Sequence, residues 1–200
     1  MGIENSLFEG QLICLAPIDH EKDAEVESKW THDAGYLRML DTRPAVPLCA
    51  AKVKKNYEAI EKEMGEARNV FHFTIRTRPA NAGAGEQTGK DSRLVGFARI
   101  YWVEWSHGAG VVKLGIGETA DRGQGFGSEA LRLLLRFAFR EINLYRLSAL
   151  ISQDNPVALH LFQKAGFVEE VRRRKALYRD GRRFDLIHVG ILREEWERLV

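Results

Sequence analysis

A glycine-rich segment with the sequence Arg-Gly-Gln-Gly-Phe-Gly, residues 122–127, directly precedes the clearest helical pattern of the chain. Over residues 127–140 apolar side chains recur every three to four positions, which predicts an amphipathic helix. The run 111–118 before it predicts a strand. A glycine-rich strand-to-helix connection turns backbone N–H groups toward one point and lets an anion approach closely. We therefore expect an α/β protein that binds an anionic group here, with Arg122 as a charged donor at the rim.

Other interpretations of this segment were weighed against the same residues. It could be no more than a tight strand-to-helix turn. A triphosphate-binding Walker loop is excluded, because no Gly-Lys-Ser/Thr is present. A dinucleotide fingerprint needs differently spaced glycines in a unit that opens the fold and an acidic residue about 20 positions on. Glu141 is near that distance but falls at a helix end, so this interpretation is rejected as well.

The remaining patterns predict a single domain, residues 1–200, that contains both strands and helices. Strands are expected at 12–15, 70–75, 94–102, 111–118, 146–151, 167–171 and 184–192. Helices are expected at 19–31, 52–67, 127–140 and 155–165. The Gly-, Ala- and polar-rich stretch 79–92 is predicted to be a flexible surface loop. Asp180-Gly181 indicates a hairpin turn before the last strand.

Charge and composition restrict the classes of partner. The chain has 30 Lys and Arg residues against 28 Asp and Glu residues. The electrostatic field of the whole protein is therefore too weak to favour binding of nucleic acid. The basic run 172–175 is interpreted as the solvated face of a strand or turn, or else as a guide for an acidic substrate. No apolar run approaches the roughly 20 residues of a membrane span, and the start has no secretory pattern. Cys14 and Cys49 show no metal or redox spacing. We expect a cytoplasmic protein with free cysteines.

Two motifs in a fixed order make the sequence similar to a known superfamily. The first is Arg or Gln, two residues, Gly, one residue, then Gly or Ala, which Arg122, Gly125 and Gly127 fit. The second is Asn155-Pro-Val-Ala158, followed downstream by Lys-Ala-Gly-Phe, residues 164–167. Together they resemble the GNAT superfamily of N-acetyltransferases, and the stretch 118–130 with the tail 175–196 resembles its RimJ/RimL-type branch. That branch includes acetylases of protein N-termini and of small amines.

The resemblance implies a fold and a cofactor. The fold is α/β of the α+β kind: a mixed, mostly antiparallel sheet of about six to seven strands flanked by helices, with a splayed strand pair that holds the CoA arm. The cofactor is acetyl-CoA as co-substrate, without a metal. The residues implied to contact it are Ile116, Gly117, Arg122, Gly123, Gln124, Gly125, Phe126, Gly127, Ser128, Asn155, Phe162 and Lys164. Asn155 is independently expected to be a helix N-cap, because Pro156 follows it.

The reaction implied is direct attack of an amine on the thioester in a ternary complex. Glu118, at the end of the splayed strand, is the candidate base, and Asn155 would position the thioester. Many members place a tyrosine where this chain has Phe162, which leaves the general acid unassigned. The alternatives are a non-catalytic CoA-binding regulatory protein of the same fold and an interaction module that uses the basic run. The acceptor is expected to be a protein N-terminus or a small amine, and a homodimer is compatible with the family.

Overall fold

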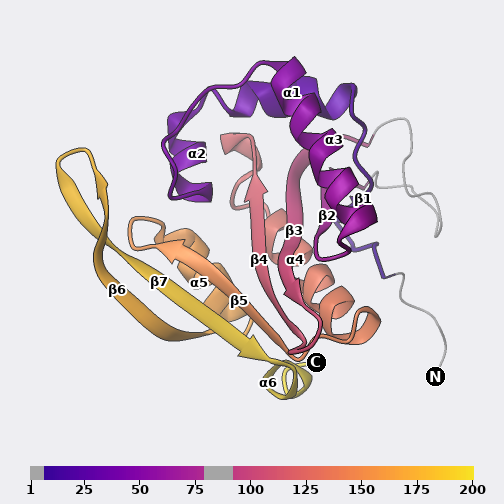
Figure 1. Cartoon of the computed structure of the whole chain (residues 1–200), viewed down its shortest axis with the longest axis vertical. Helices are drawn as coiled ribbons and strands as arrows, with labels where there is room; N and C mark the ends of the chain where they lie inside the picture. The colour runs from indigo at the N-terminus through magenta and orange to yellow at the C-terminus, as the bar shows by residue number, and fades with distance from the viewer. Residues whose placement is uncertain (1–6, 79–91) are drawn as a thin grey trace.

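A seven-stranded sheet organises the computed structural model, which describes residues 7–78 and 92–200 (Figure 1). Its strand order is β1-β2-β3-β4-β5-β7-β6. The strands are β1 (Ile13–Ala16), β2 (Phe71–Thr77), β3 (Leu94–Glu104), β4 (Ala109–Ile116), β5 (Arg146–Ser152), β6 (Val168–Arg179) and β7 (Arg182–Leu192). Neighbouring strands are antiparallel except for β4 and β5, which are parallel. The expected mixed, mostly antiparallel sheet is confirmed.

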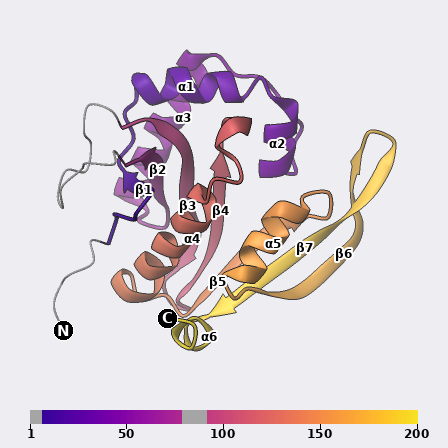
Figure 2. The same cartoon turned by 180° about the vertical axis from the view of Figure 1, so that it is seen from behind.

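Helices cover both faces of this sheet. They are α1 (Lys22–Trp30), α2 (Ala34–Leu40), α3 (Ala50–Glu66), α4 (Phe126–Arg136), α5 (Pro156–Lys164) and α6 (Arg193–Glu197). The first three gather on one face (Figure 1), and α4 and α5 cover the other face, which is nearer the viewer in Figure 2. The long β6–β7 hairpin extends beyond the body of the sheet (Figure 2). No helix in the described ranges is long and apolar enough to cross a bilayer.

The helix α4 anchors the core. Leu131, Leu133, Leu134 and Leu135 are each 2% exposed or less and pack in one cluster with side chains of the central strands. Burial of each such leucine contributes about 1.5–3 kcal/mol, so this amphipathic face fixes the helix against the sheet. The helix then widens into a π-helical turn, Phe137–Glu141, before β5. The N-terminal end of α4 is thereby held at the end of β4.

The strands β4 and β5 separate after a short contact. They pair only through Ala109–Arg146, Gly110–Leu147 and Val111–Ser148, although both strands continue for several residues. Figure 1 shows the two strands diverging, with α2 beyond the open end. A strand that leaves its neighbour exposes main-chain N–H and C=O groups along its free edge. The predicted splayed pair is therefore present, and it opens toward the start of α4.

Most elements predicted from the sequence are confirmed, with ends shifted by a few residues. The helices α2 and α6 were missed, and β6 is longer than the predicted strand 167–171, because it continues through the basic run to Arg179. All four residues of that run are exposed, as expected for a solvated face. The predicted flexible loop 79–92 lies outside the described residues except for Ser92.

Candidate functional site

The glycine-rich loop has the geometry of a strand-to-helix anion site. After β4, a short 3-10 turn, Thr119–Asp121, leads into the loop, and Gly125 is the N-cap of α4. Gly123 and Gly125 have φ values of +77° and +90°, which side-chain-bearing residues rarely adopt. The first N–H groups of α4 have no intrahelical acceptor. These two glycines therefore give the loop a shape in which main-chain donors remain available at the helix N-terminus.

Two carboxylates that were not predicted from the sequence as site residues hold the loop in place. Asp121 is 8% exposed and accepts two hydrogen bonds from the guanidinium of Arg93, at 2.6 and 2.8 Å. Glu129, in the first turn of α4, accepts the N–H groups of three successive residues of the chain entering β1. This contact brings Leu12 beside the loop, where its Cδ1 lies 3.2 Å from the position of a Cβ on Gly125. Both contacts join residues distant in sequence.

The side chain of Arg122 folds back onto the end of β4. Its Nη2 donates to the carbonyl of Gly117 at 2.7 Å, and its Nε donates to the carbonyl of Ile116 at 3.3 Å. A longer contact of 3.4 Å reaches Asp33. Arg122 thus caps the last carbonyls of the splayed strand in this structure, and the main-chain N–H groups of the loop remain as donors. Its expected contact with the cofactor stays a prediction.

The free edge of β4 faces the splay. The N–H of Gly117 donates to the carbonyl of Val95 in β3, at 2.9 Å. Since main-chain groups alternate in an antiparallel ladder, those of Ile116 and Leu114 point to the opposite side, toward the gap before β5. A Cβ on Gly127 would lie 3.7–3.8 Å from side chains of Leu161 and both β4 residues. One end of the gap is therefore lined by the start of α4, by α5 and by the last residues of β4.

The α5 residues differ in what they contact. The Oδ1 of Asn155 accepts the N–H of Ala158 at 3.1 Å, which confirms the N-cap expected from the sequence. Its Nδ2 makes only a 3.4 Å contact with the carbonyl of Met39. Phe162 is 5% exposed, and its ring packs edge-on to that of Phe167 with centroids 4.9 Å apart. Lys164 is exposed at the end of the helix. Their roles toward a cofactor stay predictions.

Glu118 lies just beyond β4, on the face that α1 covers. One of its carboxylate oxygens accepts the indole N–H of Trp30 at 3.0 Å, and the residue is otherwise exposed. A Cβ on Gly117 would overlap the indole, so glycine is needed for Trp30 to pack there. Gln124 and Ser128 are exposed in the loop and the first turn of α4, and Phe126 packs against the core. The sequence-predicted residues of the β4–α4 connection are thus contiguous, whereas Phe162 is directed into the core.

A cavity of about 510 Å³ opens on the α2 side of the splay. Its walls come from the α2 end, β3, β4, β5 and the β6–β7 hairpin: Arg38, Met39, Leu40, Asp41, Thr42, Arg43, Arg99, Tyr101, Trp102, Val112, Lys113, Leu150, Ser152, Arg179 and Leu186. The exposed side chain of Trp102 is one of them. Trp105 is not among them; its indole N–H donates to the carbonyl of Arg68. No local sequence pattern indicates the basic lining residues of β3 and β6, because they are far apart along the chain.

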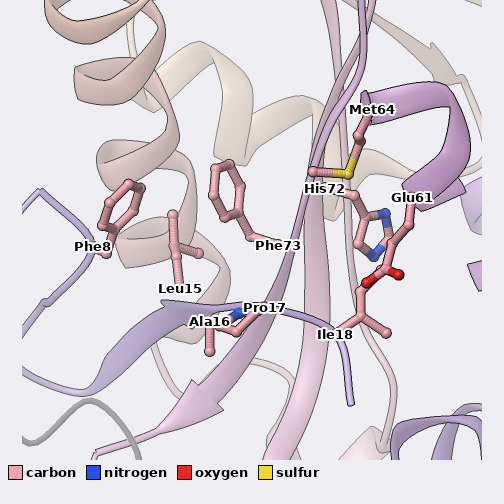
Figure 3. Close-up of a pocket in the computed structure, with 9 residues that line it drawn as sticks. All are labelled: Phe8, Leu15, Ala16, Pro17, Ile18, Glu61, Met64, His72 and Phe73. Carbon is pink, nitrogen blue, oxygen red and sulfur yellow. The ribbon is translucent and has the colours of Figure 1, made fainter. Parts of the chain in front are cut away.

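A second, smaller hollow of about 290 Å³ lies at the opposite edge of the sheet. Figure 3 shows Phe8, Leu15 and Phe73 on one side of β2 and Met64, His72 and Glu61 on the other. The imidazole of His72 stacks on Phe97 with centroids 5.5 Å apart, and neither ring nitrogen has a hydrogen-bond partner among the described residues. Burial, with the nearby charge of Arg99, lowers the pKa of His72 to about 3, so the ring is neutral. This hollow is remote from the loop and the splay.

No metal site accompanies these features within residues 7–78 and 92–200, where no group of three or more His, Cys, Asp or Glu side chains is placed to hold an ion. The available donors are main-chain N–H groups, guanidinium groups and hydroxyls. These groups suit an anionic organic ligand.

Comparisons with known proteins agree with this geometry. The family model for the acetyltransferase (GNAT) domain matches residues 13–168. An SPbeta prophage-derived N-acetyltransferase, YokL, of Bacillus subtilis (strain 168) is 30% identical over 151 residues, covering 70% of this chain and 85% of the relative. An N-acetyltransferase 9-like protein of Caenorhabditis briggsae is 32% identical over 141 residues, covering 68% of this chain and 64% of that protein.

A solved structure shows the same fold at low sequence identity. Spermidine N-acetyltransferase from Vibrio cholerae, in complex with CoA and spermine, superposes with a TM-score of 0.74 at 16% identity, over 92% of this chain and 98% of that one. The family match covers the strand, loop and helix described above, together with α5. The chain therefore belongs to the GNAT family of N-acetyltransferases.

Proposed function

We propose that this protein transfers the acetyl group of acetyl-CoA to an amine in a ternary complex. The observation that carries the proposal is that three features meet along β4: the anion-binding loop at its end, the free edge of Ile116 and Leu114, and the cavity beside Val112 and Lys113. The complex of the Vibrio cholerae relative with CoA and spermine supports the cofactor and the class of acceptor.

The cofactor would follow the strand from the loop to the cavity. Main-chain N–H groups over residues 122–128 would bind the pyrophosphate, and the pantetheine arm would pair with the free edge of β4. A strand advances about 3.3 Å per residue, so an arm running back from Gly117 reaches Val112 and Lys113 after four to five residues. The thioester would then lie at the wall of the cavity, where an acceptor can approach it.

The chemical step needs an amine without its extra proton. The nitrogen attacks the thioester carbonyl, a C–N bond forms, the C–S bond breaks, and the sulfur leaves as thiolate. The amine gives up one proton to a base, for which Glu118 is the candidate. Glu118 lies about 16 Å along the strand direction from Lys113, so it would act through water. A thiol pKa of about 8.5 makes an unprotonated leaving group tolerable, so Phe162 in place of a tyrosine does not block the reaction. A main-chain N–H on the free edge of β4, that of Ile116 or of Leu114, would stabilise the oxyanion.

The second candidate is a non-catalytic CoA-binding protein of the same fold. The observation that favours it is Phe162, which is packed in the core where a proton donor is common in the family. Release of free CoA from acetyl-CoA in the presence of amines separates the two functions. We expect amine-dependent release by the wild-type chain and a reduced rate for Glu118→Gln. Acetyl-CoA binding without release for any amine would support the second candidate.

The finer expectations rest on the sequence patterns and on the resemblance. The RimJ/RimL-type branch, a location in the cytoplasm, independence of nucleic acid and membranes, and a homodimer stay predictions. One relative, the Vibrio cholerae spermidine N-acetyltransferase, has been described in a dodecameric form. Light scattering of the purified chain would show whether this protein also assembles.

A further inference from the structure

The wall of the cavity beside β4 carries an excess of positive charge. Its lining includes five basic side chains and one acidic side chain. The basic ones are Arg38, Arg43, Arg99, Lys113 and Arg179, and the acidic one is Asp41. Two further carboxylates, which are not part of the lining, pair with two of these cations. Asp154 lies 3.7 Å from Arg179, and Asp180 lies 2.8 Å from Arg38. The lining itself therefore presents cations to whatever occupies the cavity.

The single lining carboxylate is already engaged. Asp41 accepts the ammonium of Lys113 at 2.7 Å and the guanidinium of Arg43 at 2.9 Å. Although burial raises it, hydrogen bonds from these two cations hold the pKa of Asp41 well below its usual range. One carboxylate thus serves two cations, and it has little capacity to neutralise a third.

Arg99 is the lining cation that makes no ion pair with a carboxylate of residues 7–78 and 92–200. It is partly buried, its Nε has no hydrogen-bond partner, and its guanidinium lies 5.1 Å from the centroid of the Tyr101 ring. Glu63 of α3 acts on it only through its field, since no ion pair joins them in the part of the chain that the structure describes. Burial of an unpaired cation is costly, so a counter-charge at this point would be favourable.

The placement of Arg99 opposite Lys113 increases this cost. The two residues are directly paired across the β3–β4 ladder. Like charges in directly opposed positions destabilise a sheet, and here both side chains line the cavity. Lys113 lies on the part of β4 that an arm running from the loop would reach, and Arg99 lies beside it on β3. An anion bound between them would remove the repulsion.

We infer that the acceptor is an amine that carries a carboxylate, which Arg99 and Lys113 bind while the amine faces the thioester. This inference rests on the proposed acetyl transfer and narrows its acceptor. Ser152 adds a buried hydroxyl without a partner among the described residues. The volume of about 510 Å³ fits a small molecule or the end of a peptide. A polyamine would place more positive charge against these cations, so spermidine would be a poor acceptor.

The test compares matched acceptors at saturating acetyl-CoA, with release of CoA as the readout. The small-molecule pair is 4-aminobutanoate and 4-aminobutanamide, the peptide pair is C-terminally amidated Ser-Glu-Ala-Ala and Ser-Gln-Ala-Ala, and spermidine is the cationic acceptor. In at least one pair we expect kcat/KM of the anionic member to exceed that of its neutral partner by roughly tenfold or more, the size of one charged hydrogen bond. The pair that shows the preference identifies the source of the anion.

Variants assign the preference to the cavity. Arg99→Gln should remove it, mainly through KM of the anionic acceptor, and Arg99→Lys should keep most of it. Arg140→Gln is the matched control, because Arg140 lies 5.2 Å from the Trp196 ring in a similar contact, outside the cavity lining. Equal or better use of the neutral members or spermidine, or an Arg99→Gln variant with an unchanged preference, would overturn the inference and leave acetyl transfer intact. Absence of CoA release with every acceptor would overturn the proposed function as well.

Discussion

The carboxylate of Glu129 connects the start of α4 to the chain entering β1, and removing its charge should destabilise the fold. Its oxygens accept the N–H groups of Gln11 and Leu12 at 2.7 Å and that of Ile13 at 3.0 Å. In Glu129→Gln, the amide oxygen can keep the two bonds to Leu12 and Ile13, but its NH₂ group faces the N–H of Gln11. Each of the two retained hydrogen bonds weakens by about 1 kcal/mol, because the acceptor is no longer charged. The repulsion between the two opposed donors costs a further amount of no more than about 1 kcal/mol. We expect a loss of roughly 2–3 kcal/mol in the free energy of unfolding.

Urea denaturation measures this loss, and the linear extrapolation applies to both proteins if their slopes agree. Glu25→Gln is the matched control, because Glu25 also lies in the first turn of a helix but is exposed and makes no side-chain hydrogen bond among the described residues. Its substitution should cost no more than about 0.5 kcal/mol. Equal midpoints for the two variants would refute the role given to Glu129.

Two further predictions concern single side chains. Because the pKa of His72 falls from 6.5 to about 3 on folding, the unfolded chain binds more protons below pH 6.5, and stability is lost as the pH falls. Between pH 7.5 and 5.5, the free energy of unfolding of the wild type should fall by about 1.4 kcal/mol more than that of His72→Phe. Urea denaturation at both pH values measures this, and an equal fall for the two proteins would contradict it. Asn155→Ala should lose about 1 kcal/mol with its N-cap. Asn155→Asp keeps the cap but lacks the amide. If the KM of this variant for acetyl-CoA is above that of the wild type, the amide also contacts the cofactor. If the KM equals that of the wild type, the role of Asn155 is limited to the cap.

The elements predicted correctly are those with a strong local pattern. The helix α4 shows apolar residues at helical spacing, and the loop before it contains two glycines at positive φ, so both could be found without tertiary information. The helix α2 was missed because it is only seven residues long, begins with Ala-Gly and buries a single side chain, Tyr36. The strand β6 was cut short because its basic residues are solvated; pairing with β7 extends it through two register shifts.

The site was predictable only where it follows one stretch of chain. The β4–α4 connection is local, so its residues could be named in order. The anchors of the loop, Asp121 with Arg93 and Glu129 with the start of β1, join segments far apart in sequence. The basic wall is of the same kind, because Arg99 and Arg179 come from distant strands that only the folded sheet and its hairpin bring to one cavity.

The central claim is that the glycine loop binds the pyrophosphate of acetyl-CoA, and calorimetric titration with acetyl-CoA tests it most directly. The variant is Gly125→Val, because a side chain at φ +90° is strained and its Cβ would press on Leu12. Gly181→Val is the matched control, with φ +75° and open space around it in the β6–β7 turn. We expect micromolar-range binding by the wild type and the control, and binding at least about tenfold weaker by Gly125→Val. Absence of binding by the wild type, or equal binding by all three proteins, would contradict the account.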